Sequence, residues 1–415
     1  MLELNFIREN PEKLKKACQD KQVKVDVDKI LELDKKKREV MTEMEMLRAE
    51  QNKISRGGKE NNVLIVQAKE IKEKIKEMEP DLEKIDAELK TLLLQLPNIP
   101  FDDVPVGKDD SENIVLRKVG RVKLSVGNNA IKDYMELAEP LDLIDTKRAG
   151  KVAGSRFGYL KNKLPLLWFA MVNLAMETAV KKGFVPVLPP VMLKEEMARG
   201  TGYFEAGDRN EAYFLPDDNM YLIGTAEQSL VSMHADEILN ESDLPLRYVG
   251  FSTCFRREAG SYGKDTKGIL RVHQFDKVEM VVFSKPEDSR KEHELLLSIE
   301  EKLMKDLELP YQVIDICTGD LGRPAAKKYD IEAWMPSENK YRETHSTSNC
   351  TDFQSRRLNI RYRDKAGKIN FVHILNGTAF SQRPMLMIME NYQQKDGSIK
   401  IPKVLQKYCG FKEIK

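Results

Sequence analysis

Residues 254–280 read CFRREAGSYGKDTKGILRVHQFDKVEM and place two polar clusters around a glycine-containing loop. The middle of this stretch, residues 259–268, is polar and contains three glycines, whereas residues 250–258 and 270–283 are rich in aromatic and β-branched side chains. Such flanks around a polar loop are typical of two paired strands. We therefore predict an antiparallel hairpin with a long loop.

Side chains alternate between the two faces of a strand, so the hairpin sorts its residues into two sets. The polar set is predicted to comprise Cys254, Arg256, Glu258, Arg271, His273, Phe275, Lys277 and Glu279. Val272, Val278 and Met280 would point to the opposite, apolar face. Arginines suit phosphate, an aromatic ring suits a base, and a carboxylate can accept from an exocyclic amine, so this face would suit ATP. An exposed hairpin with solvated charges is the alternative.

Composition limits the class of protein. The 415 residues carry 68 Lys plus Arg against 67 Asp plus Glu, a net charge of +1, so a polyanionic partner would have to meet local basic patches. We expect a cytoplasmic protein with no membrane association, because no apolar run is long enough to span a bilayer and the start, MLELNFIRENPEK, is too polar for a signal peptide. The five cysteines lack zinc-ligand spacing, so we expect reduced thiols and no zinc.

A long helical arm is predicted over about residues 27–96. Its first limb repeats apolar residues every seven positions, at Leu33, Val40, Leu47 and Ile54, with Ile30, Met44, Gln51 and the charged Lys37 on the interleaved positions. Its second limb alternates spacings of four and three, at Leu64, Ala68, Ile71, Ile75, Met78, Leu82, Ile85, Leu89 and Leu92. These are coiled-coil seams, and Gly57-Gly58 between them predicts the tip of an antiparallel hairpin. Pro80 lies off the seam and predicts a kink without a break. A dimerising coiled coil is the alternative.

A proline-rich linker separates this arm from a region of mixed composition. Pro97, Pro100 and Pro105 stand in an acidic stretch, which leads us to divide the chain into residues 1–105 and 106–415. In the second part we expect a helix over residues 163–183, one from about Thr225 and one from about Pro286 to residue 307. The strands between them look antiparallel, so the predicted class is α+β.

Three segments of the second part resemble the motifs of class II aminoacyl-tRNA synthetases. Residues 185–190 resemble the first motif, residues 255–258 with their loop and return strand the second, and residues 376–383 with 390–393 the third. The helical arm, Thr225-Ala226-Glu227, residues 343–346 and residues 348–350 resemble one member, the seryl-tRNA synthetase family. The resemblance covers essentially the whole chain and implies a C-terminal antiparallel sheet flanked by helices.

The resemblance also implies a site for ATP, Mg²⁺ and serine. The implied nucleotide-binding residues are Arg256, Arg257, Glu258, Val272, Phe275, Glu343, Thr344, His345, Ser346 and Arg383. The implied serine-binding residues are Thr225, Ala226, Glu227, Arg256, Glu279 and Thr378. Arg256 and Arg383 would be the catalytic residues, at the α- and γ-phosphates, and Glu343 with Ser346 would hold Mg²⁺ with ATP. Glu279 and Thr378 would read the serine hydroxyl.

The implied activity is that of a serine–tRNA ligase. The partners are ATP, L-serine, tRNA(Ser) and a second copy of the chain in a homodimer that uses the first motif; whether tRNA(Sec) is also a substrate stays open. The arm would dock on the long variable arm of the tRNA through a basic tip formed by Lys53, Arg56 and Lys59.

Two features depart from the family pattern. Thr344-His345 stands where a hydrophobic residue and a serine are common, and we expect His345 to face outward. The segment from Thr378 to Arg383 is one residue shorter than expected. Because Arg383 keeps its distance from Asn391, this gap bears on Thr378.

Two other classes of function compete with this one. A catalytically inactive paralogue acting as an RNA-binding or interaction protein would be favoured by the loss of Arg256, Glu258, Glu279 or Arg383, and all four are present. A ligase that charges a carrier protein would not need the helical arm.

Overall fold

The computed structural model describes residues 2–56, 62–122, 125, 130–204, 208–259 and 267–415. These residues form two compact units, Met1–Pro97 and Asn98–Lys415. The division falls at the start of the proline-rich linker. The separate roles given to the two parts of the chain stay predictions.

The first unit is helical throughout. Two short helices, α1 (Leu4–Glu9) and α2 (Pro11–Asp20), precede two long ones, α3 (Val27–Arg56) and α4 (Asn62–Gln95). Pro11 begins α2, where its fixed φ suits the helix and its missing N–H leaves no bond unmade. Ile7, Leu14 and Ile30 are fully buried together with residues near the end of α4, which fixes the short helices at the base of the arm.

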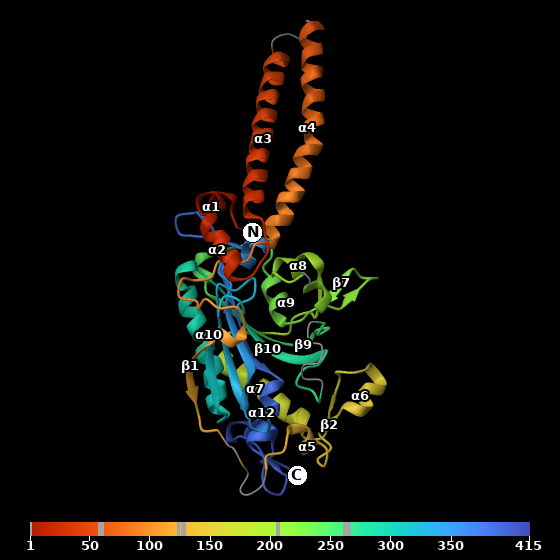
Figure 1. Ribbon diagram of the computed structural model, residues 1–415, viewed down its shortest axis with the longest axis vertical. Coiled ribbons are helices and arrows are strands. Elements are labelled where there is room, and N and C mark those ends of the chain that lie inside the picture. Colours follow the sequence, from red (N-terminus) through yellow and green to blue (C-terminus); the bar gives the residue numbers. More distant parts are fainter. Residues whose placement is uncertain (1, 57–61, 123–124, 126–129, 205–207, 260–266) are drawn as a thin grey trace. The chain divides into compact units, whose positions relative to one another are not determined.

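α3 and α4 form the predicted antiparallel hairpin (Figure 1). Three contacts between the helices show the antiparallel pairing. Lys37 Nζ lies 2.6 Å from Asp86 Oδ1, Lys74 Nζ lies 2.9 Å from Glu43 Oε1, and Gln51 donates to the Ala68 carbonyl at 3.3 Å. All predicted seam residues of both limbs are buried or partly buried. The apolar side chains of the seam are therefore covered within one chain, which confirms the hairpin. α4 also runs through Pro80 without a break.

An eight-stranded sheet organises the second unit. Its order is β1 (Ile114–Val119), β11 (Tyr311–Asp315), β12 (Lys327–Met335), β13 (Lys340–Asn349), β16 (His373–Ser381), β10 (Gln274–Ser284), β9 (Leu246–Phe255) and β4 (Val185–Val187). All neighbours are antiparallel except β4, which is parallel to β9. The predicted α+β class with an antiparallel sheet is confirmed.

The hairpin predicted from residues 254–280 is the β9–β10 pair. Phe275 lies opposite Cys254, and Glu279 lies opposite Gly250. Val278, Met280 and Val282 belong to the main hydrophobic core, as the alternation predicts. The strands end at Phe255 and begin at Gln274, so alternation does not apply to residues 256–258 and 271–273.

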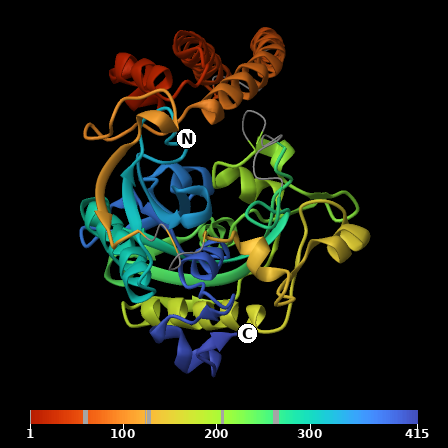
Figure 2. The same cartoon turned by 60° about the horizontal axis from the view of Figure 1, so that its bottom comes forward.

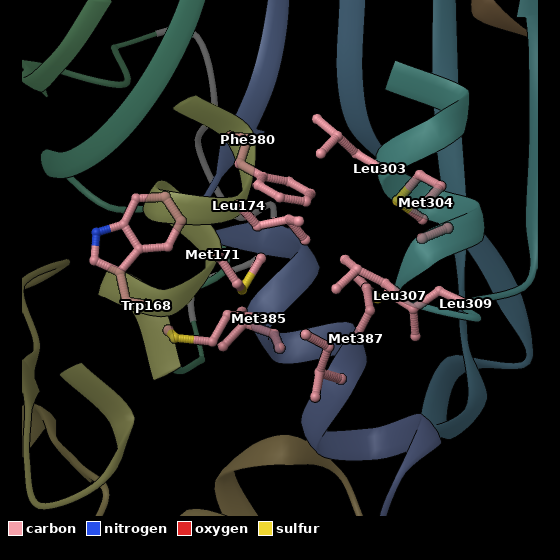
Figure 3. Close-up of a cluster of buried hydrophobic side chains, with 14 of the residues drawn as sticks. Trp168, Met171, Leu174, Leu303, Met304, Leu307, Leu309, Phe380, Met385 and Met387 are labelled. Atoms are coloured by element: carbon pink, nitrogen blue, oxygen red, sulfur yellow. The ribbon is translucent and has the colours of Figure 1, made fainter. Parts of the chain in front are cut away.

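Three helices cover one face of the sheet: α7 (Leu164–Val180), α10 (Ser289–Asp306) and α12 (Arg383–Asn391). Figure 2 shows α7 running along this face, and Figure 3 shows side chains of all three helices meeting around Phe380 of β16. The helices predicted over residues 163–183 and 286–307 are confirmed. The second of them opens with a short 3-10 turn, Pro286–Asp288, before α10 begins.

The opposite face is divided between helices and a cavity. α9 (Ala226–Ser232) and α11 (Phe353–Leu358) pack on one end of it, against Val281 and Phe283 of β10. α9 begins after Thr225 as predicted, because the Thr225 hydroxyl accepts from the Glu227 backbone N–H at 3.3 Å and caps the helix. The rest of this face stays open to the site described below.

The remaining elements are short. The helices are α5 (Tyr134–Ala138), α6 (Thr146–Ala153), α8 (Glu195–Gly200), α13 (Gln406–Cys409) and the 3-10 turns Asp110–Glu112, Asp208–Glu211, Glu241–Asp243, Pro336–Glu338 and Lys403–Leu405. The strands are β2 (Ile144–Asp145), β3 (Tyr159–Leu160), β5 (Met192–Lys194), β6 (Phe214–Leu215), β7 (Met220–Leu222), β8 (Ile238–Asn240), β14 (Arg361–Arg363), β15 (Ile369–Phe371), β17 (Ile399–Lys400) and β18 (Glu413–Ile414). Within the described residues no helix has both the length and the apolar character needed to cross a membrane.

Candidate active site

A polar cavity of about 420 Å³ lies on the open face of the sheet. Its walls come from β10, β13 and β16 and from the segments that follow β9 and precede β12. The predicted site residues that line it are Glu227, Arg256, Glu258, Val272, Phe275, Glu279, Glu343, Thr344, His345, Ser346, Thr378 and Arg383. Residues separated by up to 156 positions in the chain, Glu227 and Arg383, thus meet in one place.

Three predicted site residues do not line this cavity among the residues that the structure describes. The Arg257 guanidinium lies 5.5 Å from the centre of the Tyr213 ring. Thr225 is buried as the cap of α9, and Ala226 is fully buried in the core beneath that helix. These two hold Glu227 in place at the cavity wall.

Arg256 lies between the two ends of the cavity. Its Nε donates to the Gly224 carbonyl at 3.2 Å, and its guanidinium lies 5.4 Å from the centre of the Phe275 ring. It lines the same cavity as Glu343 at one end and Tyr203 at the other. Arg256 can therefore contact groups bound at both ends.

Glu258 faces the cavity from an unusual backbone conformation. Its φ is +51°, in the left-handed region that non-glycine residues rarely adopt. Its Oε2 accepts from Arg271 Nη1 at 2.9 Å, and both side chains are largely buried. Arg271, which alternation marked as a weaker phosphate candidate, thus holds this carboxylate beside Phe275.

His273 was predicted to share this polar face, and that prediction is wrong. Its ring packs 5.4 Å from Phe157 and 6.3 Å from Tyr213, and its Nδ1 lies 3.0 Å from the Arg256 carbonyl oxygen. The physical reason is that the extended strand begins only at Gln274. Before that point the chain turns, and the two-residue period no longer sets direction.

A cluster of charges forms one end of the cavity. Arg383, the first residue of α12, donates from Nη1 to Glu343 Oε2 at 3.2 Å and to the Glu343 carbonyl at 3.0 Å. Burial opposes the charged form of Glu343, but the charges of Arg383 and Lys328 outweigh it and lower its pKa to about 2. The Glu343 side chain is 49% exposed. It is therefore an accessible, ionised carboxylate next to an arginine.

Lys328 and Asp330 of β12 complete this end, and the sequence gave no role to either. Lys328 Nζ lies 3.2 Å from Asp330 Oδ2, and Asp330 lies opposite Ser346 in the sheet. Burial raises the pKa of Asp330 to about 6, although Lys328 works in the opposite direction. The alternating Lys-x-Asp at the start of β12 was the signal that could have identified them.

His345 was predicted to face outward, and the structure corrects this. The side chain is buried, 1% exposed, with its Nδ1 2.8 Å from the Thr344 hydroxyl and its ring 5.6 Å from Phe380. Burial lowers its pKa to about 3, so the ring is neutral. Its position follows from a bulge in β13: Ile331 pairs with His345 and Glu332 with Glu343, leaving Thr344 as the extra residue.

The other end of the cavity holds Glu279, Thr378 and Lys277. Glu279 is 2% exposed, and its Oε2 accepts from Thr378 Oγ1 at 3.2 Å and lies 2.7 Å from Lys277 Nζ. A bulge sets this pairing, because Val278 lies opposite Phe380 but Glu279 lies opposite Thr378, which leaves Ala379 as the extra residue. Thr378, the residue affected by the shortened segment, does reach Glu279.

Glu227 is a second buried carboxylate at this end. It accepts from Gln354 Nε2 at 2.7 Å and from the Tyr203 hydroxyl at 3.2 Å. Burial and then the charge of Glu279 raise its pKa. Tyr203 and Gln354 carry no motif that sequence reasoning could use, and only the fold brings them to Glu227.

The predicted tRNA-contact residues belong to the first unit. Lys53 is exposed on α3, and Arg56 is the last residue of that helix. Lys59 lies outside the described residues. In the described part of the chain, no group of three or more His, Cys, Asp or Glu side chains is arranged to hold a metal.

Comparisons with known proteins agree with this geometry. Residues 1–100 match the seryl-tRNA synthetase N-terminal domain, and residues 213–392 match the tRNA synthetase class II core domain (G, H, P, S and T). The serine–tRNA ligase of Dictyoglomus turgidum is 46% identical over 100% of this chain and 99% of its own. That of Pyrococcus horikoshii is 45% identical over 100% and 97%.

Solved structures give the same result. A crystal structure of seryl-tRNA synthetase from Pyrococcus horikoshii complexed with ATP is similar with a TM-score of 0.94 and 43% identity, covering 100% of this chain and 99% of its own. The cytoplasmic serine–tRNA ligase from Naegleria fowleri in complex with AMP has a TM-score of 0.91 and 33% identity, with the same coverage. The alternative of an unrelated carrier-protein ligase is not favoured by full-length similarity of this kind. The chain belongs to the seryl-tRNA synthetase family.

Proposed function

We propose that the chain is a serine–tRNA ligase. It activates serine with ATP to give seryl-adenylate and pyrophosphate, and then transfers serine to the 3'-terminal adenosine of tRNA(Ser). The similarity to serine–tRNA ligases over the whole chain supports the reaction. The structural observation that carries the proposal is the position of Arg256, between an arginine–carboxylate end and an end with two buried carboxylates.

The activation step brings two anions together. A serine carboxylate oxygen attacks the α-phosphorus of ATP, the bond to the β-phosphate bridging oxygen breaks, and pyrophosphate leaves with that electron pair. Arg256 would neutralise both the serine carboxylate and the α-phosphate, since it lines the cavity between the two ends. No covalent nucleophile is needed, and positioning supplies most of the rate.

The nucleotide would occupy the end that holds Phe275, Glu258 and Arg383. Phe275 offers a partly exposed ring for adenine, and the Glu258 carboxylate can accept from its amine. Arg383 stands at the N-terminus of α12, where backbone N–H groups also favour phosphate. Arg383 would bind the γ-phosphate there. Arg257, stacked on Tyr213, would act on the nucleotide only after a change of side-chain conformation.

Magnesium fits the charged end of this cavity. Glu343 supplies an ionised carboxylate, Ser346 a hydroxyl, and Asp330 Oδ1 is a buried oxygen without a hydrogen-bond partner among the described residues. Hard oxygen donors of this kind suit Mg²⁺, which keeps few protein ligands when phosphates supply the rest. Glu343 and Ser346 would hold the ion. Bound with ATP, it would add positive charge against the phosphate oxygens.

Serine would lie at the end that holds Glu279, Thr378 and Glu227. Glu227 would accept from the α-ammonium group and Glu279 from the side-chain hydroxyl, and both carboxylates line this cavity. Alanine would leave the Glu279 acceptor buried and unpaired, a cost of about 1–3 kcal/mol or more. Threonine keeps the hydroxyl, so it would have to be excluded by crowding of its methyl group against Thr378.

ATP–pyrophosphate exchange across a panel of amino acids tests the proposal. We expect exchange that depends on serine and Mg²⁺ and needs no tRNA. Exchange with a different amino acid and none with serine would end the proposal, and no exchange with any amino acid would favour an inactive paralogue. Charging of purified tRNA(Ser) then separates this enzyme from a carrier-protein ligase, and tRNA(Sec) is tested in the same assay.

A homodimer is proposed from an exposed apolar surface. Leu166 and Phe169 of α7 are 52% and 53% exposed, and Val185 and Leu188 of the first motif are 54% and 79% exposed. Large apolar side chains gathered in one region of a surface mark contact sites. Sedimentation of the full chain should give twice the 47.7 kDa of one copy. Phe169→Glu should shift it toward the monomer, whereas Val152→Glu, at an apolar site on α6 that is 74% exposed, should not.

The arm and the compartment complete the proposal. The arm would dock on tRNA through its tip, because its locally basic residues suit a phosphate backbone. All five cysteines are free thiols, which is the usual state in a reducing cytoplasm. We place the enzyme there.

A further inference from the structure

Lys277 is a buried cation at the serine end of the cavity, and neither the motifs nor the comparisons give it a function. It lies on β10 two residues before Glu279, on the same face of the strand. The Lys277 side chain is 10% exposed and the Glu279 side chain 2% exposed, and Nζ lies 2.7 Å from Oε2. A lysine is seldom buried to this degree without a partner that requires its charge.

The contacts of Glu279 are confined to one of its two carboxylate oxygens. Lys277 Nζ and Thr378 Oγ1 both approach Oε2, at 2.7 Å and 3.2 Å. Among the described residues none donates to Oε1. Two donors on one oxygen fix the plane of the carboxylate and leave the other oxygen as the acceptor for a substrate hydroxyl.

The surroundings explain why Glu279 needs a cation. Its charge raises the pKa of Glu227 on α9 and that of Glu300 on α10, which lies across the sheet. Glu300 is completely buried, next to Gly377. Three carboxyl groups therefore influence one another in a region of low solvent access. Without Lys277, the buried Glu279 carboxylate would lie near two other carboxyl groups with no cation to balance its charge.

A Glu279 side chain that is free to turn would read the substrate differently. Its second oxygen would no longer be held in one position as the acceptor for a substrate hydroxyl. It would hold the serine hydroxyl less tightly and would lose less when alanine replaces serine. The ability to choose serine therefore depends on the orientation of one carboxylate.

We propose that Lys277 is a specificity-determining positioning residue, which holds the Glu279 carboxylate in one orientation so that serine is accepted and alanine is rejected. This inference rests on the proposed function, in which Glu279 reads the serine hydroxyl. Lys277 acts through Glu279 and needs no contact with serine.

The chain offers a matched control in a second buried lysine. Lys327 of β12 is 5% exposed on its side chain, and its Nζ lies 2.9 Å from Asp315 Oδ2. The burial and the distance are close to those of the Lys277–Glu279 pair, and both pairs lie in the same sheet. Among the described residues, neither Lys327 nor Asp315 lines the cavity. Lys327→Met therefore removes a similar buried charge away from the substrate.

The test measures exchange with serine and with alanine on the full-length protein. Lys277→Met should raise the KM for serine and lower the serine-over-alanine ratio of kcat/KM by about ten- to a hundredfold, the range expected when a hydrogen bond to a carboxylate is lost. The KM for ATP should change much less. Lys327→Met should leave the serine-over-alanine ratio within about twofold of the wild-type value, even if it lowers the melting temperature.

A double-mutant cycle with Glu279→Gln decides whether Lys277 acts through Glu279. Adding Lys277→Met to Glu279→Gln should change the ratio little, because the carboxylate that the lysine serves is already gone. The double variant also removes both charges together, so it should fold even if Lys277→Met alone does not. Lys277→Arg keeps the charge and should preserve more of the ratio than Lys277→Met.

Two outcomes would overturn the inference. An unchanged ratio in Lys277→Met would show that the lysine serves stability alone, and additive effects in the cycle would show that it acts on the substrate directly. Exchange measured on the wild-type protein distinguishes a failure of this inference from a failure of the proposed function. Serine-dependent exchange by the wild type with an unchanged ratio in Lys277→Met rejects the inference alone, whereas exchange with another amino acid rejects both.

Discussion

The arm and the catalytic unit use the same kinds of ion pair with different consequences. In the arm, Lys37 and Asp86 lie 2.6 Å apart with 27% and 47% of their side chains exposed. In the catalytic unit, Lys277 and Glu279 lie 2.7 Å apart with 10% and 2% exposed. Exposed pairs contribute about 0–1 kcal/mol, whereas removing one partner of a buried pair costs about 3–5 kcal/mol. The distance is nearly the same, and burial decides what the pair does.

The two regions also differ in how their contacts are distributed along the chain. The arm pairs α3 with the next helix, α4, through one repeating seam. The sheet places β16 between β13 and β10, and β1 beside β11, so several neighbours in space are distant in sequence. The arm is therefore a regular scaffold on which single changes act locally. In the catalytic unit one side chain can affect several strands.

The largest expected effect is that of Arg256→Ala on serine-dependent exchange. Arg256 is the cation between the two ends of the cavity, and the loss of such a transition-state donor lowers the rate about 10²–10³-fold. Arg257→Ala is the control. Because the Arg257 guanidinium lies over the Tyr213 ring, this substitution should have a much smaller effect on exchange. Circular dichroism would confirm that both variants are folded. Near-normal exchange in folded Arg256→Ala would contradict its placement.

Shortening the arm should separate the two regions functionally. Replacing residues 48–71 with a short turn keeps Met44 and Ile75, which are buried in the seam. Exchange should stay within about twofold of the wild-type rate, whereas tRNA charging should lose about tenfold or more in kcat/KM because backbone contacts dominate RNA affinity. A loss of exchange would show instead that the arm supports the catalytic unit.

A single added methyl group should destabilise the sheet. A Cβ at position 377 would lie 3.0 Å from Glu300 Oε1 and 3.1 Å from Thr347 Oγ1. Gly377→Ala should therefore lower the free energy of unfolding by about 1–3 kcal/mol, the usual cost of overpacking. Gly150→Ala is the control, since a Cβ there meets no atom within 4 Å and α6 should gain stability. Equal midpoints for the two variants would mean that Glu300 adjusts freely.

At neutral pH the smallest effect is that of a buried histidine of the catalytic unit, which acts only as the pH is lowered. Burial and, to a lesser extent, Lys327 lower the pKa of His293 to about 4, although its contact with the Thr347 carbonyl works in the opposite direction. An unfolded histidine has a pKa near 6.5, so below pH 6.5 the unfolded state binds a proton that the folded state does not. Stability should fall between pH 6.5 and 4, by at most about 1.4 kcal/mol per pH unit.

His293→Gln should remove this part of the pH dependence. Tryptophan fluorescence during urea denaturation reports it, because the only two tryptophans, Trp168 and Trp334, both lie in the second unit. The comparison at pH 7, where His293 is neutral in both states, corrects for the change in packing. Parallel pH profiles of the variant and the wild type would show that His293 becomes protonated without unfolding.

Much of the molecule could be predicted because its patterns are local. The seven-residue spacing from Leu33 onward predicted which side of α3 is buried. The alternation from Phe275 to Met280 predicted which side chains face the cavity and which face the core. The third prediction of this kind was the start of α9, because Thr225 supplies the cap. In each case a few neighbouring residues carry the information, and the structure agrees with the prediction.

Other predictions failed where the local rule ended. His273 lies one residue before the strand begins, so alternation gave the wrong direction. His345 follows a bulge at Thr344, and it is buried beside Phe380. Neither a strand end nor a bulge has a reliable sequence signal, because both depend on how the partner strand is placed.

The sequence by itself determined the elements: the arm, the hairpin, the α+β class, and the arginines and carboxylates of the site. The tertiary structure alone decided which of those charges meet and how deeply they are buried. A bulge at Ala379 sets Thr378 against Glu279, and β12 brings Asp330 beside Ser346. The role proposed for Lys277 could be inferred only from its burial next to Glu279. The physical reason is that propensity and periodicity act between neighbours, whereas the energy of a charge depends on everything that excludes water from it.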